Sequence, residues 1–258
     1  MSRACFPRGR GPVTSDGIGA WFCNDNAAST VVTDSSGSAN HGTATDNTSA
    51  LSTTGPGSWG ANTALAFNGT TQYVNLGDIL DASIAGAATR IFTFAAWIYP
   101  TSLGTRRYIL GKWNDTGNLR EYQFYLETTD KLGITVCSDP ADATSYIRRF
   151  SALSIPITTW THVVAVVNLN LAAYSRLKVY VNGQDNDGGT EAGLTGFGGS
   201  ITDTAGLLAL GSAHGGAAVN LFAGSLSDMR VYNAALGANE IAAHYMAGAP
   251  RTSMVGAM

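Results

Sequence analysis

Short apolar runs separated by turn-forming residues recur along the whole chain. In the run LKVYV (177–181), Leu177, Val179 and Val181 alternate with Lys178 and a tyrosine. A period of two is typical of a strand with one buried face. The run ends at an Asn-Gly pair (182–183), which favours a tight hairpin turn. We therefore predict a half-buried strand and a hairpin at this point.

Two runs are apolar on both faces, IFTFAAWIYP (91–100) and WTHVVAVVNL (160–169), and we expect them to be central strands. Pro100 ends the first of them, because proline cannot donate to a ladder. Other strand-like runs are bounded by Gly, Asn, Asp and Pro, without the long helices that a parallel α/β sheet requires. The pattern predicts an all-β protein with two antiparallel sheets packed as a sandwich.

The run FAGSLSDMRVY (222–232) has the composition of a strand, and the spacing changes after it. From 234 to 245 the pattern is helical, and Leu236, Ile241 and Tyr245 can share one face. The sequence therefore predicts a last long strand followed by one short C-terminal helix.

Composition and charge bound the organisation of the chain. Its 258 residues carry a formal net charge of -3, which gives no electrostatic footprint for nucleic acid or an anionic membrane. We expect an N-terminal arm at 1–16, one domain at 17–248 and a loose tail at 249–258. No apolar run reaches the length of a membrane span, and the start lacks the apolar segment of a signal peptide.

The three cysteines, Cys5, Cys23 and Cys137, are widely spaced and indicate neither a disulfide framework nor a zinc site. We expect three separate thiols, with a Cys5–Cys23 pair as the alternative. The histidines are also scattered, and we expect structural roles for them: His41, His162, His214 and His244.

Several segments together carry a family resemblance: DSSGSANHGTA, ALAFNGTTQYVNLG, FTFAAWIYP, WTHVVAVV, LKVYVNGQ, LLALGS and FAGSLSDMRVYNAALGANEIAAHY. In this order and spacing they resemble the laminin G-like, pentraxin-like branch of the concanavalin A-like lectin/glucanase superfamily, from about Gly17 to Gly248. The resemblance implies a jelly roll whose last long strand returns beside the first. It also implies that the short helix closes one end of the sandwich through Leu236, Ile241 and Tyr245.

Catalysis is not expected from the acidic residues. Glycoside cleavage needs two carboxylates across the scissile bond, and the glucanases of this superfamily place them on one strand as Glu-x-Asp-x-(x)-Glu. Here Glu127 and Asp130 have the wrong spacing, and Glu121 and Glu127 share a face without an acidic residue between them. No nucleophile elbow, phosphate loop or metalloprotease helix occurs. We predict that the chain is not an enzyme.

Calcium is the cofactor to consider, because hard cations bind clusters of carboxylate and carbonyl oxygens in loops. The loop DSSGSANHG supplies Asp34 and Asn40, and Asp228 lies on the closing strand. The resemblance implies that such a loop can hold a structural calcium near that strand. The alternative is that Asp34 and Asn40 cap their own turn while Asp228 binds a neighbouring backbone. The resemblance does not extend to the pentraxin calcium cage, because SAHGGAAVN after LLALG has no carboxylate, although Asn114 and Asp115 could take the place of part of its earlier loop.

Sugar binding would need aromatic platforms beside polar groups, since pyranose rings present apolar faces. Four aromatic residues on or beside the middle strands are candidate ligand-binding residues: Trp113, Tyr122, Tyr125 and Tyr146. We expect three tryptophans to fill the core instead: Trp21, Trp97 and Trp160.

Three classes of function follow. We favour a non-catalytic recognition or adhesion module that binds a glycan or a protein and is displayed on a larger assembly, such as a phage particle. The alternatives are a purely structural virion decoration or assembly protein, and a glycan-cleaving enzyme. The expected location is extracellular or on a virion surface, with oligomer formation through the arm at 1–16.

Overall fold

The computed structural model describes residues 17–57, 59–80, 91–189, 192–193, 196–215, 218 and 220–249. The predicted arm at 1–16 lies outside these residues, and so does the predicted tail except for Ala249. Of the cysteines, Cys5 also lies outside them, whereas Cys23 and Cys137 are buried. The alternative Cys5–Cys23 pair therefore stays a prediction.

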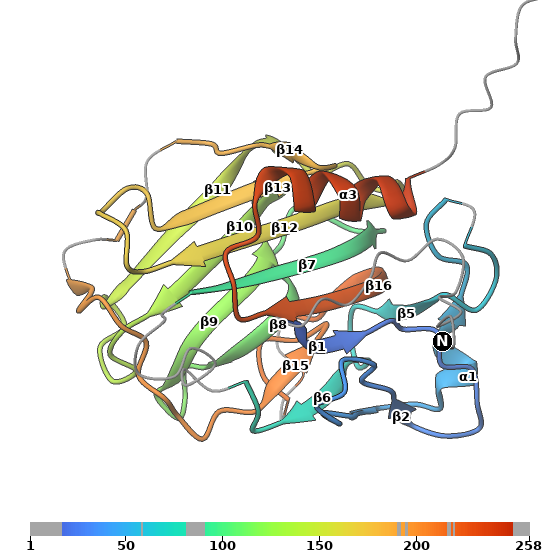
Figure 1. Cartoon of the computed structure of the whole chain (residues 1–258). Helices are drawn as coiled ribbons and strands as arrows, with labels where there is room; N and C mark the ends of the chain where they lie inside the picture. Colours follow the sequence, from blue (N-terminus) through green and yellow to red (C-terminus); the bar gives the residue numbers. More distant parts are fainter. Residues whose placement is uncertain are drawn as a thin grey trace, which may run out of the picture.

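The described residues form two antiparallel sheets of eight strands that pack face to face (Figure 1). In spatial order, sheet A contains β14 (Gln184–Asp185), β13 (Leu177–Val181), β12 (Thr161–Asn168), β7 (Ile91–Pro100), β16 (Ala223–Tyr232), β5 (Ala64–Asn68) and β4 (Ser52–Thr53), and β1 (Gly17–Trp21) also pairs with β16. Sheet B contains β11 (Tyr146–Ser154), β10 (Lys131–Cys137), β9 (Leu119–Leu126), β8 (Arg107–Asn114), β15 (Leu208–Leu210), β6 (Val74–Gly77), β3 (Gly42–Ala44) and β2 (Val31–Val32). The predicted antiparallel sandwich is confirmed.

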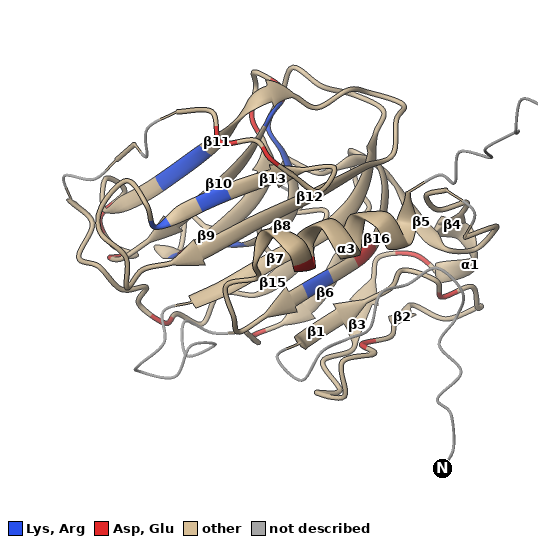
Figure 2. Cartoon of the chain, turned by 45° about the horizontal axis from the view of Figure 1, so that its top comes forward, with Lys and Arg blue, Asp and Glu red and all other residues tan. Residues whose placement is uncertain are grey.

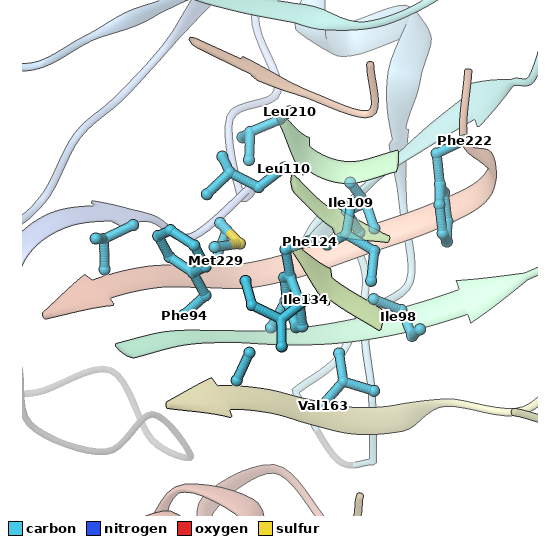
Figure 3. Packing of buried hydrophobic residues seen from close by; sticks show 14 of the residues in the cluster. Phe94, Ile98, Ile109, Leu110, Phe124, Ile134, Val163, Leu210, Phe222 and Met229 are labelled. Carbon is cyan, nitrogen blue, oxygen red and sulfur yellow. The ribbon is translucent and has the colours of Figure 1, made fainter. Parts of the chain in front are cut away.

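The sandwich core lies between the two sheets, where the apolar side chains of alternate positions meet (Figure 3). Strands β7, β12 and β16 contribute from sheet A, and β8, β9, β10 and β15 contribute from sheet B. The labelled core residues are Phe94, Ile98, Val163, Met229, Ile109, Leu110, Phe124, Ile134, Leu210 and, just before β16, Phe222. The expected central strands β7 and β12 are buried along nearly their whole length, because both of their faces are covered.

Two local predictions from the sequence are confirmed. Val181 pairs with Gln184 across the Asn182-Gly183 turn, and both turn residues have positive φ, 50° and 75°. This is the backbone that a type I′ hairpin requires. The last long strand, β16, lies beside the first, β1, with Trp21 opposite Met229.

The C-terminal helix α3 (Ala238–Gly248) covers the outer face of sheet A, where it lies across β12 and β13 (Figure 1). This corrects the expectation that it closes one end of the sandwich. Leu236 and Ile241 form a second apolar cluster with outward-facing residues of the sheet, among them Val164 and Tyr180. The helix therefore buries a sheet face that would otherwise meet solvent. A single turn, α1 (Thr48–Leu51), precedes β4.

The tryptophans divide between three places. Trp21 belongs to the sandwich core, as expected. Trp97 is buried on the outer face of sheet A, where its ring stacks on Tyr245 of α3 at 5.7 Å. Trp160 is half-buried against Tyr99, so the expectation of a core position is wrong for it.

Charged residues are sparse and of both signs on the ribbon (Figure 2). Within the described part of the chain, no helix combines the length and the apolar character needed to cross a membrane.

Candidate carbohydrate-binding pocket

The outer face of sheet B carries a pocket of about 240 Å³. Strands β8 to β11 build it with three aromatic residues and a set of polar ones. Its lining is Arg106, Trp113, Asp115, Gln123, Tyr125, Thr135, Tyr146 and Arg148. Because α3 covers the outer face of sheet A, this pocket lies on the sheet that the helix leaves uncovered.

Strand register explains why these side chains share one face. Thr135 of β10 lies opposite Gln123 of β9 on one side and opposite Arg148 of β11 on the other. Cross-strand partners point to the same face of a sheet. The pair two positions further along β10 and β11, Cys137 opposite Tyr146, therefore lies on this face as well. The alternate residues of the same strands, such as Phe124, point into the sandwich core.

A glycine on β10 lets the aromatic rings come close to one another. Gly133 lies between Tyr125 and Phe150 in the strand pairing. A Cβ at Gly133 would lie 2.9 Å from the Tyr125 ring and 3.0 Å from the Phe150 ring. The missing side chain therefore allows these two rings to meet edge to face at 6.3 Å.

Hydrogen bonds fix most of the lining. The Trp113 indole N–H donates to Asp115 Oδ1 at 3.0 Å. The hydroxyls of Tyr125 and Thr135 share a hydrogen bond of 3.0 Å. Burial raises the pKa of Tyr125 to about 12, so its hydroxyl stays neutral at physiological pH. These groups are held in place before any ligand arrives.

The amide of Gln123 is different, because it makes no hydrogen bond to any residue that the structure describes. The residue is only 3% exposed and lines the pocket. Its amide atoms are not among the buried side-chain atoms that lack a partner, so the amide reaches solvent through the pocket and is open to a ligand there.

Three of the four aromatic residues predicted to bind a ligand meet at this pocket: Trp113, Tyr125 and Tyr146. The fourth, Tyr122, does not. Its ring packs in the core against Phe94 at 5.2 Å, and its hydroxyl donates to the carbonyl oxygen of Leu80. Tyr122 and Tyr125 are three positions apart on β9, so alternation sends them to opposite faces.

The polar lining of the pocket is not among the residues predicted from the sequence to bind a ligand. Gln123 and Thr135 are the outward residues of YQFYL and GITVC, and they alternate with core residues. This alternation indicates that Gln123 and Thr135 lie together on the outer face of sheet B. Arg106 and Arg148, each the first of an Arg-Arg pair, had no such signal, because arginines at a protein surface are usually solvated.

The predicted calcium ligand Asp34 already has hydrogen-bond partners for both of its oxygens. Oδ1 accepts from the backbone N–H groups of Ala20 and Ser36 at 2.9 Å each. Oδ2 accepts from the Ser36 hydroxyl at 2.8 Å and from the N–H of Asn40 at 3.0 Å. The Asn40 carbonyl oxygen accepts from the Trp21 indole N–H at 2.8 Å. Asp34 therefore acts as the cap of its own turn.

The third predicted ligand, Asp228, faces a cation of the protein itself. Its carboxylate forms an ion pair with the Arg230 guanidinium, with distances of 2.9 Å to Nε and 3.2 Å to Nη2. Among the residues that the structure describes, no group of three or more His, Cys, Asp or Glu side chains is placed to hold an ion. Asp34, Asn40 and Asp228 thus do not fit a calcium shell in this arrangement.

We therefore expect the melting temperature of the purified chain to be the same in excess chelator and in millimolar calcium, because an ion stabilises only a fold that binds it. Differential scanning calorimetry under both conditions measures this. A rise in calcium that disappears in Asp34→Asn or Asp228→Asn would contradict the expectation and restore the proposed ion.

The carboxylates considered for catalysis do not converge. Glu121 is fully buried and lies 3.2 Å from Lys112 Nζ, whereas Glu127 forms an ion pair of 2.7 Å with Arg106. Asp130 accepts from the N–H of Gly104 at 2.7 Å. The prediction that Glu121 and Glu127 share a strand face is wrong, because a β-bulge between the pairs Lys112–Tyr122 and Trp113–Arg120 makes Glu121 an extra residue.

Burial dominates the electrostatics of Glu121. It raises the pKa of the carboxyl group to about 7, although Lys112 and the hydrogen bonds from Thr204 act in the opposite direction. Thr204 donates its N–H and its hydroxyl to Oε1, and Oε2 is buried with no hydrogen-bond partner among the described residues. Glu121 is therefore a buried member of an ion pair that lies outside the pocket lining.

The histidines serve the structure, as expected, where their contacts are described. His162 is buried between Trp97 and Tyr245, with ring centroids 5.3 and 6.3 Å away. Burial lowers its pKa to about 3, and the nearby His244 and Arg230 act in the same direction. His244 shares a hydrogen bond of 3.1 Å with the Tyr232 hydroxyl. Both rings lie under or within α3.

A jelly-roll sandwich with an aromatic pocket on an outer sheet face belongs to the class of lectin-like β-sandwich domains. Residues 68–242 match the family Laminin_G_3 of the concanavalin A-like lectin/glucanases superfamily, and the chain belongs to this family. The resemblance stated from the sequence is thus confirmed. None of the curated proteins compared with the chain matches it in sequence.

Solved structures share the fold at low identity. Domain 4 of AbnA, a GH43 extracellular arabinanase from Geobacillus stearothermophilus in complex with arabinotriose, has a TM-score of 0.56 and 20% identity over 89% of this chain and 98% of that chain. A sialidase from Trypanosoma rangeli has a TM-score of 0.58 and 14% sequence identity, and the match covers 95% of this chain and 34% of the sialidase. The receptor-binding domain of a botulinum neurotoxin C/D mosaic serotype has a TM-score of 0.59 and 11% sequence identity. The match covers 89% of this chain and 51% of that chain. This chain thus spans a third to a half of the last two.

Proposed function

We propose that the domain is a non-catalytic carbohydrate-binding module that holds a sugar in the pocket on the outer face of sheet B. The observation that carries the proposal is the composition of that pocket. Trp113, Tyr125 and Tyr146 supply apolar surface for a sugar ring, and Gln123 supplies an amide without a partner among the described residues. Sites of this kind combine aromatic surface with a few placed polar groups.

The size of the pocket indicates how much of a glycan it takes. Pockets for drug-sized ligands measure roughly 300–1,000 Å³, and this one measures about 240 Å³. It therefore suits a single ring, either a chain end or a side branch, with the rest of the glycan outside. The arabinanase domain that shares this fold over nearly its whole length was solved with arabinotriose, which supports a glycan as the ligand class.

The charge pattern of the pocket supports binding without catalysis. Glycoside hydrolysis needs two carboxylates about 5–10 Å apart on either side of the bond. Of the described residues that line the pocket, Asp115 is the one carboxylate, and it pairs with Arg120 at 2.7 Å. A second acid would have to come from outside this lining.

As part of the same proposal, the module acts outside its cell or on the surface of a larger assembly, where lectin-like domains meet glycans. A phage particle, with oligomer formation through the arm at 1–16, stays a prediction, and so does the alternative of a purely structural decoration protein. The arm lies outside the described residues. The binding experiment below separates recognition from decoration.

The test is a glycan array probed with the intact 258-residue chain and with Tyr146→Ala. We expect the wild type to bind a defined set of oligosaccharides and the variant to bind them about 5- to 30-fold more weakly, since truncating a central aromatic contact typically costs about 1–2 kcal/mol. Tyr174→Ala is the matched control, because Tyr174 is 58% exposed and lies outside the pocket lining.

Three outcomes would count against the proposal. Absence of binding to any glycan would favour the decoration protein, and binding that Tyr146→Ala leaves intact would place the site elsewhere. Release of reducing ends from a bound glycan, lost in Glu121→Gln or Glu127→Gln, would overturn the non-catalytic part.

A further inference from the structure

One cation of the pocket has no counter-charge among the residues that the structure describes. Arg148 of β11 makes no ion pair and no side-chain hydrogen bond to any residue that the structure describes, and its Nε is buried without a partner. Glu191, which directly precedes Ala192, the bridge partner of Arg148, lies outside those residues. An arginine in this state has unused donors beside an aromatic pocket.

Packing holds Arg148 in place instead of an ion pair. Its guanidinium lies over the rings of Tyr146 and Phe150, 5.5 and 5.4 Å from their centroids. Its backbone is fixed by two hydrogen bonds of 3.0 Å exchanged with Ala192. Stacking on aromatic rings leaves the planar N–H fork of arginine available for an acceptor, so the group is pre-organised.

The other charges of the pocket are matched locally. Arg106 pairs with Glu127 at 2.7 Å and lies over the Tyr125 ring at 4.9 Å. Asp115 pairs with Arg120, also at 2.7 Å. Once these pairs are counted, Arg148 gives the described residues of the pocket an excess of positive charge.

We infer that the pocket selects an acidic sugar, with Arg148 as the residue that binds the carboxylate or sulfate group of the ring. The inference rests on the proposed carbohydrate-binding function and adds the class of ligand. Arginine binds carboxylate and sulfate-like oxyanions through two parallel hydrogen bonds. The anion lies at Arg148 while the apolar face of the ring lies against Tyr146.

The experiment uses matched pairs of oligosaccharides. Uronate-bearing and sialate-bearing probes are compared with their carboxyl-reduced forms, and a sulfated probe with its desulfated form. We expect the wild type to bind the acidic member of at least one pair tenfold or more tightly than the neutral member, because a hydrogen bond to a charged group is worth more than a neutral one. The carboxylated and sulfated arms distinguish the two sources of charge.

Arg148→Gln is expected to remove the preference, so that both members of the pair bind alike. Lys178→Gln removes the same charge from an exposed position of sheet A and should leave the preference unchanged. Rising salt should weaken binding of the acidic member in the wild type. If Arg148→Gln does not fold by circular dichroism, Arg148→Lys is used instead; it keeps the charge but lacks the planar fork, and we expect it to bind the acidic member with a smaller preference than the wild type.

Two results would overturn the inference and can be told apart from failure of the proposed function. Equal binding of neutral and acidic members, lost in Tyr146→Ala, would keep the carbohydrate module and reject the acidic ligand. An acid preference that survives in Arg148→Gln would also reject the role of Arg148. Absence of binding to every probe would reject both proposals together.

Discussion

Lys112→Met is expected to lower the free energy of unfolding by about 3–5 kcal/mol, because it leaves a buried carboxylate without its cation. The side chains of Lys112 and Glu121 are both fully buried, and 3.2 Å separates Nζ from Oε1. Lys112 also contacts Asp78 at 3.0 Å. Equilibrium unfolding in urea measures the change.

The pH dependence of this loss is a second readout. Burial raises the pKa of Glu121 to about 7 in the folded protein, and losing Lys112 would raise it further. Below pH 5 the folded carboxyl group is neutral in both proteins and needs no cation. Above pH 7 it ionises beside Lys112 in the wild type, whereas in the variant it must keep a proton or bury an unmatched charge, and either costs stability. The loss in Lys112→Met should therefore be larger above pH 7 than below pH 5.

Two variants serve as controls. Lys178→Met changes an exposed lysine of sheet A and should shift stability by no more than about 0.5 kcal/mol. Lys112→Met combined with Glu121→Leu removes both buried charges and should recover most of the lost stability, since apolar pairs can replace a buried ion pair at little cost. A loss below about 1 kcal/mol in the single variant would contradict this account of the pair.

His162→Phe is expected to reduce the decrease in the free energy of unfolding that the wild type shows at acidic pH. The folded pKa of His162 is about 3, below the ordinary value of 6.5. Between pH 6.5 and about pH 3, His162 binds a proton in the unfolded state but not in the folded state. The free energy of unfolding therefore decreases as the pH falls through this range. The loss from this group is about 1.4 kcal/mol per pH unit within that window.

The measurement is the difference in free energy of unfolding between wild type and His162→Phe at pH 8, 7, 6, 5 and 4. The difference should be constant above pH 7. Below pH 6.5 the wild type should lose stability that His162→Phe keeps, so the variant becomes relatively more stable as the pH falls. Other groups near α3, including His244, Arg230, Asp228 and Glu240, are present in both proteins and largely cancel. Parallel profiles throughout this range would show that His162 does not control the acid side.

Part of the pocket lining on sheet B is predictable from the chain alone. Trp113, Tyr125 and Tyr146 were selected as aromatic residues beside middle strands, and all three line the pocket. Tyr122 was selected by the same criterion and lies in the core. Composition identifies an aromatic residue, but the face it occupies depends on its position in the strand and on the register with its neighbours.

Acidic residues were harder to place from sequence. Glu121 and Glu127 stand six positions apart, which predicts one face for an uninterrupted strand. The bulge on β9 breaks the alternation and turns Glu121 towards Lys112. A bulge depends on how two strands fit together, so the spacing within one strand could not reveal it.

The sequence by itself determined the strands, the hairpin at Asn182-Gly183, the sandwich class and the family, because local alternation and turn chemistry are properties of short segments. Only the tertiary structure decided that α3 covers sheet A, that Asp34 caps its own turn and that Arg148 has no counter-charge among the described residues. These outcomes depend on residues far apart in the chain, whose distances are set when the two sheets pack. The chemistry of the pocket is thus a product of packing, built on strands that the local pattern had already defined.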